Sequence, residues 1–394
     1  MILTFAHVVD ALSLRADFLH PELGVLRVGA ADLALLGIDA SSTSGVDLVF
    51  KQVSDNGSNI KSAWEEDGKW VSCANHRLEL ATHPFTWTRK NKGGDDAKIP
   101  SGSVQDSFRK GRGIVGYLHV APNAPIDFKQ CQQHEGLPQR QINLDCKTRW
   151  RTAFIMSNQL VASKRAVIRM DTFPDYKKPG ETWASNKLGF TDWDHLEESS
   201  ACLSDAAEAS QLLEGDLYIT SSLVVPFAYK LMATSSPNHT VHFKNRKQDE
   251  FNDATVKPVD VPHAGLVSKV QAARKTYHQD LIDRFDSNVP EHVKKFWFIA
   301  SMLDPRFKKL KFKKDNMLSA ARRLEAQQWL TAEFNANYKD KIARGASDSD
   351  SNSDSDSNDG AAAPSAPEPK RQKVSLAAVF DEESDNSSSE DEAD

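Results

Sequence analysis

A short run of apolar positions near residue 50 predicts the first element of the chain. Residues 46–53 are rich in β-branched and aromatic side chains, which is typical of a buried strand. Gly57 then breaks the pattern, because glycine tolerates turn dihedrals that other residues avoid. Asp55 therefore lies just past the end of the predicted strand.

From residue 73 onward, apolar positions recur every three or four residues, which predicts a series of helices. Cys73, His76 and Leu80 share one face of the first of them. Further helices are expected over 104–118, 150–168, 193–213, 218–231, 266–285 and 313–338. Polar stretches with proline or glycine are expected to be loops at 84–102, 171–190 and 234–262.

Charge is distributed unevenly along the chain. Residues 347–394 contain fourteen Asp or Glu and three Lys or Arg, a net charge of −11. The formal net charge of the whole chain is −6, so residues 1–346 carry a net charge of +5. The acidic segment has too little apolar surface to offset the entropy of ordering its backbone, which predicts a disordered tail. A mildly basic body is compatible with polyanion binding but also with many other functions.

Several features indicate the compartment. Lys370, Arg371 and Lys373 in the tail fit the K-K/R-x-K/R pattern of a nuclear import signal, so we expect a nuclear protein. The four cysteines are widely separated and form no CxxC, which favours the reduced thiols of the cytosol or nucleus. We find no signal-peptide pattern and no 18-residue apolar run, so no membrane contact is expected.

Four motifs resemble those of the hAT superfamily of DNA transposases, many of which carry a BED zinc finger upstream. The motifs are DNGSN at 55–59, CANHRLEL at 73–80, TRW at 148–150 and LDPRFK at 303–308. In that family a strand-terminal D-N-x-x-N is followed by C-x-x-H-x-L-x-L. The resemblance places Asp55, Asn56, Asn59, Cys73 and His76 at the motif positions.

The resemblance also implies a metal-dependent reaction. Asp55 corresponds to the second of three acidic ligands that hold two Mg²⁺ or Mn²⁺ ions for DNA cleavage and strand transfer. Asp10 lacks the tryptophan context of the first ligand, and the family's S-x-x-E-R-x-F-S segment does not occur in this sequence. Because one carboxylate cannot hold the metal pair, we expect no cofactor for this chain and no DNA cleavage by it alone.

In the same family, the Arg-Trp pair contacts DNA and its indole stacks on an unpaired base. The resemblance thus assigns DNA binding to Arg149 and Trp150. The family dimerises through a C-terminal region that this sequence does not contain, so we expect weak or no self-association.

Each of these residues also has a simpler structural interpretation. Asp55 can cap the following helix, which is worth about 1 kcal/mol. Cys73 and His76 have a spacing found in zinc sites, but with no second pair a packed thiol and a hydrogen-bonded imidazole are favoured. Trp150 can be a core aromatic, and Arg149 can pair with a carboxylate.

The sequence therefore predicts an α-rich α/β fold in three parts. These are a partial RNase H-like fragment (1–82), a helical insertion (83–342) and a disordered acidic tail (343–394). The predicted function is that of a transposase-derived nucleic-acid-binding protein. Two alternatives stay open: a fragment of an intact transposase whose exons were missed in gene prediction, and a domesticated transcriptional regulator or protein-interaction adaptor.

Overall fold

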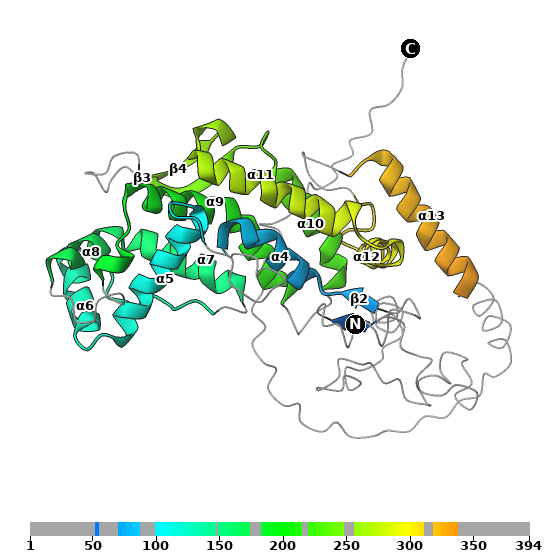
Figure 1. Ribbon diagram of the computed structural model, residues 1–394. Helices are drawn as coiled ribbons and strands as arrows, with labels where there is room; N and C mark the ends of the chain where they lie inside the picture. The colour runs from blue at the N-terminus through cyan, green and yellow to red at the C-terminus, as the bar shows by residue number, and fades with distance from the viewer. Residues whose placement is uncertain are drawn as a thin grey trace, which may run out of the picture.

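Helices form most of the described part of the chain, as the sequence predicts. The computed structural model describes residues 52–54, 70–86, 99–146, 149–173, 183–214, 220–247, 256–310 and 318–337. Within them, two two-stranded sheets accompany the helices. The body is elongated, with α5, α6 and α8 at one end and α12 and α13 at the other (Figure 1).

The first sheet pairs β1 (Gln52–Ser54) with β2 (Trp70–Ser72) in parallel, with Val53 opposite Val71. β1 overlaps the end of the strand predicted at 46–53, most of which lies outside the described residues. All three β2 residues are buried. Two short strands do not establish an RNase H-like sheet, so that part of the prediction remains a prediction.

The helix predicted after β2 is α4 (Ala74–Thr86), which packs against α11 (Ser268–Ile282). The rings of Phe85 and Tyr277 meet edge to face, with centroids 5.8 Å apart. The loop predicted from residue 84 is therefore wrong at its start, because Pro84 and Phe85 belong to the helix. Packing of the fully buried Phe85 outweighs the disfavoured interior proline.

Five helices follow in the next part of the chain. They are α5 (Val104–Val120), α6 (Ala124–His134), α7 (Trp150–Ala162), α8 (Lys164–Arg169) and α9 (Phe190–Leu213). The Ser103 hydroxyl caps α5 by accepting from the Asp106 backbone N–H at 3.1 Å. The sequence analysis missed α6. A proline lies in its first turn, where the missing backbone N–H costs no helical hydrogen bond.

α9 is the central helix of the body, since it packs against α4, α5, α7, α10, α11 and β3. A buried network joins the start of α9 to α5. The Ser107 hydroxyl donates to Asp192 at 2.7 Å, lies 2.9 Å from His195 Nδ1, and Lys110 pairs with Asp192 at 2.8 Å. Serine and alanine side chains along α9 allow its neighbours to approach closely.

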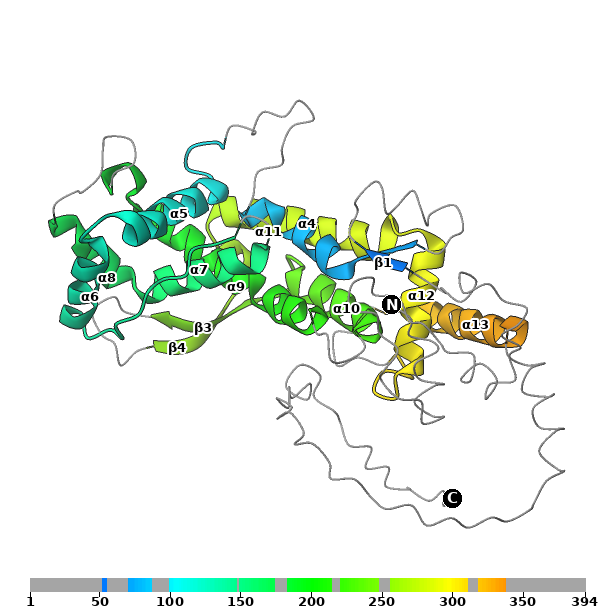
Figure 2. The same ribbon diagram turned by 90° about the horizontal axis from the view of Figure 1, so that it is seen from below.

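A β-hairpin occupies part of the region predicted as a loop at 234–262, and this prediction is wrong. β3 (Val241–Lys247) pairs antiparallel with β4 (Val256–Val261), and β3 packs against α9 (Figure 2). Phe243 is buried whereas His242 and Lys244 are exposed. This alternation is typical of a half-buried strand, and the high average polarity of the segment concealed it.

The remaining helices are α10 (Val224–Ser235), α12 (Glu291–Leu303) and α13 (Ala320–Asn337). The LDPRFK motif follows α12 and closes a turn. Asp304 accepts from the Ser222 hydroxyl at 2.8 Å and from Arg306 Nη2 at 2.6 Å. The motif thus ties the end of α12 to the turn before α10. None of the described helices has the length and apolar character needed to cross a membrane.

Candidate nucleic-acid interface

The structure describes only part of the predicted site. Asp55, Asn56 and Asn59 lie outside the described residues, although Asp55 directly follows β1 in the sequence. The predicted import signal at Lys370, Arg371 and Lys373 also lies outside them. Cys73 and His76 lie at the start of α4, and Arg149 and Trp150 lie at the start of α7.

The starts of α4 and α7 meet at the C-terminal end of α9, which we call the motif junction (Asn75, Arg151, Ser210, Gln211 and Glu214). The Asn75 amide donates to Glu214 at 3.2 Å and accepts from Ser210 at 2.7 Å. Arg151 Nη1 lies 3.5 Å from the same carboxylate, and Arg151 Nη2 donates to Gln211 at 3.0 Å. Asn75 of the CANHRLEL motif and Arg151, which directly follows the TRW motif, are thus joined through one glutamate.

Arg149 is the exposed cation at this junction. Its backbone caps α7, and among the described residues its guanidinium has no hydrogen-bond or ion-pair partner. The first turn of α7 contains no acidic residue. A cation at a helix N-terminus opposes the helix dipole, so Arg149 does not stabilise α7 electrostatically and its charge is available to an anion.

Trp150 is a core residue, with 3% of its surface exposed. Its indole Nε1 is buried without a hydrogen-bond partner among the described residues. No ring face is available to a base in this conformation, so the structure matches the simpler interpretation of this tryptophan. Base stacking by Trp150 would require the start of α7 to open, and it stays a prediction.

The chain before α7 is held in place by side chains from α5 and α7. Arg112 pairs with the buried carboxylate of Asp145 and donates to the Thr86 carbonyl at 3.0 Å. The Thr152 hydroxyl accepts from the Cys146 backbone N–H at 2.7 Å. Arg149 therefore projects from an anchored segment.

The β2–α4 junction contains the Cys73–His76 pair. His76 Nδ1 lies 3.3 Å from Glu79, and the Cys73 thiol is free and half-buried. Within the described residues, no group of three His, Cys, Asp or Glu side chains could hold a metal ion. This geometry matches the simpler interpretation of the pair.

Arg77 lies in the CANHRLEL motif but was not singled out by the sequence analysis. It donates to the Ser72 hydroxyl and, at 2.7 Å, to the Arg284 carbonyl, and it lies 5.5 Å from the Trp297 ring centroid. Burial and the charge of Arg284 lower the pKa of Arg77 to about 10, so it stays protonated at neutral pH. Arg77 thus connects β2, α4 and α12.

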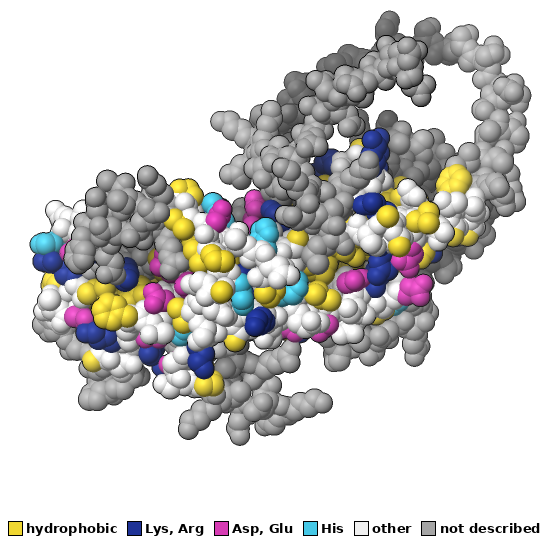
Figure 3. All heavy atoms as spheres, turned by 90° about the horizontal axis from the view of Figure 1, so that it is seen from above, with side chains coloured by type: hydrophobic (Ala, Val, Ile, Leu, Met, Phe, Trp, Pro, Cys, Tyr) yellow, Lys and Arg dark blue, Asp and Glu magenta, His cyan; other side chains and the backbone are white. Residues whose placement is uncertain are grey.

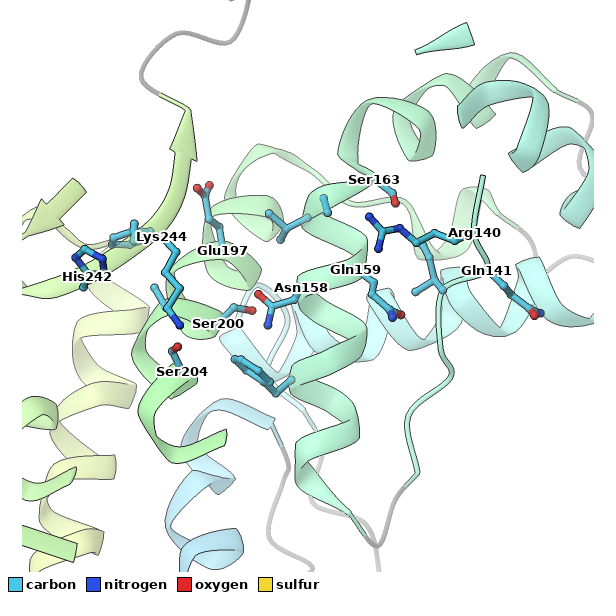
Figure 4. Close-up of a pocket in the computed structure, with 16 residues that line it drawn as sticks. Arg140, Gln141, Asn158, Gln159, Ser163, Glu197, Ser200, Ser204, His242 and Lys244 are labelled. Carbon is cyan, nitrogen blue, oxygen red and sulfur yellow. The ribbon is translucent and has the colours of Figure 1, made fainter. Parts of the chain in front are cut away.

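A groove of about 480 Å³ lies beside α7, between the chain segment 140–142, α9 and β3 (Figure 4). We call it the α7–β3 groove. Arg140 and Lys244 reach into it from opposite sides. Side-chain amides and hydroxyls line it together with two aromatic rings: Gln141, Asn158, Gln159, Ser163, Ser200, Ser204, Phe154 and Phe243. Sequence reasoning missed this groove because its walls come from four separate segments: 140–142, α7, α9 and β3.

Side-chain hydrogen bonds to its backbone fix the chain segment that carries Arg140. Gln132, which is fully buried, donates to the Arg140 carbonyl at 2.9 Å and accepts from its N–H at 3.2 Å. His119 Nε2 lies 2.7 Å from the Ile142 carbonyl, and Gln159 accepts from the Asn143 N–H at 2.7 Å. The segment is thus held in an extended form without ladder hydrogen bonds.

The surface charge outside these places is mixed. On the face shown in Figure 3, basic and acidic side chains are interspersed over the described part of the chain. The described part of that face therefore has no broad positive surface that would attract a polyanion. Arg149, Arg140 and Lys244, which have no ion-pair partner within the described ranges, are the individual cations to test.

Comparison with known proteins relates the chain to BED zinc finger proteins. The family model of the ZBED1 RNase-like helical domain matches residues 71–198, which include the CANHRLEL and TRW motifs. The human protein zinc finger BED domain-containing protein 4 is 21% identical over 335 residues, covering 84% of this chain and 24% of that protein. The chain thus spans about a quarter of the length of this relative. No solved structure matches the chain.

Proposed function

This chain is a relative of the hAT-like and ZBED proteins, and from that premise we propose that it is a transposase-derived nucleic-acid-binding protein. The motif junction is the observation that carries the proposal. It presents Arg149 at a helix N-terminus, on an anchored segment and beside a second family motif. Helix N-termini favour phosphate through their free N–H groups and their dipole, and Arg149 adds a full charge.

The proposal places this association in the nucleus and includes no autonomous DNA cleavage by residues 1–394. Two-metal cleavage needs carboxylates from several strands, whereas the family resemblance supplies Asp55 as the single candidate. The chain is incubated with transposon-end DNA and Mg²⁺ or Mn²⁺ to test this part. Cleavage that is lost in Asp55→Ala would contradict it.

Salt-dependent DNA binding tests the proposal as a whole. Fluorescence anisotropy of a labelled duplex is measured between 50 and 200 mM salt, where each phosphate contact contributes about 0.9 to the slope of log K against log salt. We expect Arg149→Ala to weaken binding and to reduce this slope by about 1.

Lys308→Ala is the matched control. Lys308 is an exposed lysine just after α12, at the opposite end of the body from α5 and α6 (Figure 1). We expect this variant to bind as the unchanged chain does. Absence of binding at low salt would refute the proposal and favour a protein-interaction adaptor.

A further inference from the structure

We infer that the α7–β3 groove is a second nucleic-acid site, which binds an unpaired nucleotide of a single strand. Its base would lie against Phe154, and its flanking phosphates would pair with Arg140 and Lys244. This inference rests on the proposed function and adds a substrate class and a place to it.

The size of the groove favours a single strand over a duplex. Its volume, about 480 Å³, falls within the range of about 300–1,000 Å³ that is typical of small-molecule sites. A duplex is recognised by protein elements that enter its own grooves, the larger of which is about 12 Å wide. The α7–β3 groove is concave and does not offer such an element, whereas one base with its sugar and phosphates is a ligand of suitable size.

The two cations are placed to hold a strand at two points. Arg140 comes from the extended segment and Lys244 from β3, so they lie on opposite sides of the groove (Figure 4). Among the described residues, neither side chain has an ion-pair partner. His242 also lines the groove, but it lies 2.8 Å from Asp260. The two hydrogen bonds with Gln132 fix the backbone of Arg140, so little backbone freedom is lost when a phosphate binds.

Phe154 is the group that would receive the base. It is one helical turn after Trp150 and is only half-buried, packed against the core but open to the groove. Aromatic rings bind successive bases of single strands by stacking, with little dependence on sequence. Asn158, exposed on the same helix, offers an amide that can hydrogen-bond to a base edge.

The same lining argues against an acidic peptide. A peptide carboxylate could pair with the two cations but has no apolar face to place against the half-buried ring of Phe154. Glu197 lies on the α9 side of the groove and disfavours every anionic ligand, so it does not distinguish a carboxylate from a phosphate. The lining therefore matches the mixed chemistry of a nucleotide, which combines an apolar face, polar edges and an anionic backbone.

Anisotropy with three labelled probes tests this inference: dT12, rU12 and a blunt 12-base-pair duplex of two strands. We expect Phe154→Leu, which keeps an apolar side chain but removes the ring, to weaken dT12 or rU12 binding by at least about fivefold. Duplex binding should not change. Arg140→Gln and Lys244→Gln should each reduce the single-strand salt slope by about 0.7.

Two controls make these results specific. Phe334→Leu removes an aromatic ring that is 45% exposed on α13, and Lys308→Gln removes an exposed lysine. Neither is expected to change single-strand binding. In addition, dT12 with one 5-iodouracil should crosslink under ultraviolet light to the peptide that contains Phe154. Whichever of dT12 and rU12 binds more tightly then identifies the strand as DNA or RNA.

The outcomes separate this inference from the proposed function. If no probe binds at 50 mM salt, the proposed function itself fails. If the probes bind but Phe154→Leu weakens duplex and single-strand binding equally, or changes neither, the inference is wrong while the proposed function stands. If Arg140→Gln and Lys244→Gln weaken single-strand binding but Phe154→Leu does not, the groove is an anion site, such as one for an acidic peptide. That result would also overturn base recognition.

Discussion

The burial of Trp150 gives a sharp test of its role, because folding and base stacking predict different results for Trp150→Ala. A buried tryptophan removes about 150–250 Å² from water, which is worth about 4–6 kcal/mol at 25 cal/mol per Å². Measured losses for Trp→Ala in protein cores are about 3–5 kcal/mol. Removing an unpaired buried N–H recovers part of the loss. We therefore expect destabilisation by about 3 kcal/mol.

Thermal unfolding by circular dichroism measures this loss. For a domain of this size, about 3 kcal/mol lowers the Tm by about 6–12 °C. Trp150→Phe keeps a buried ring and should cost less than Trp150→Ala, because it leaves a smaller cavity. Both variants, at temperatures where they are folded, should bind duplex and single strand as the unchanged chain does. An unchanged Tm for Trp150→Ala, with selective loss of binding to unpaired bases, would show that the indole is accessible and refute the reasoning.

Two further predictions concern buried charges. Arg274 donates through Nη2 to the carbonyls of Thr234, Ser236 and His239 at 2.7–3.0 Å, so Arg274→Ala should lower the free energy of unfolding by about 2–3 kcal/mol. An unchanged urea midpoint would contradict this. Burial alone would raise the pKa of Asp304, but hydrogen bonds from its neighbours outweigh burial and lower it below 3.8. The stability it contributes is present above pH 3.8 and lost as the pH falls further, so Asp304→Asn should cost about 1–3 kcal/mol at pH 6 and less at pH 3. A cost that is equal at both pH values would refute the linkage.

The position of α9 brings two family motifs close to each other. Its N-terminal end is fixed to α5 through Ser107 and Lys110, and its C-terminal end carries Glu214, which joins α4 to α7. A helix anchored at both ends gives the motif junction a fixed geometry. The same helix forms a wall of the α7–β3 groove. Both proposed contacts with nucleic acid therefore lie along α9.

The match between sequence and structure is good for the helices. The recurrence of apolar positions every three or four residues predicted α4, α5, α7, α9 and α11. α6 was missed because one proline precedes it and another lies in its first turn, and prolines are typical of helix ends and loops. The β3–β4 hairpin was missed since basic residues alternate with its buried positions and make the average polar.

The sequence by itself determined the helical character, the charge contrast between body and tail, and the motifs that relate the chain to hAT-like proteins. These properties depend on residue types and on spacings within one element, which are local. Only the tertiary structure decided that Glu214 joins Asn75 to Arg151, that Trp150 is buried while Phe154 lines a groove, and that Arg140 and Lys244 lie across from each other. Each of these depends on contacts between segments far apart in the chain, and residue spacing carries no information about which helix faces will meet.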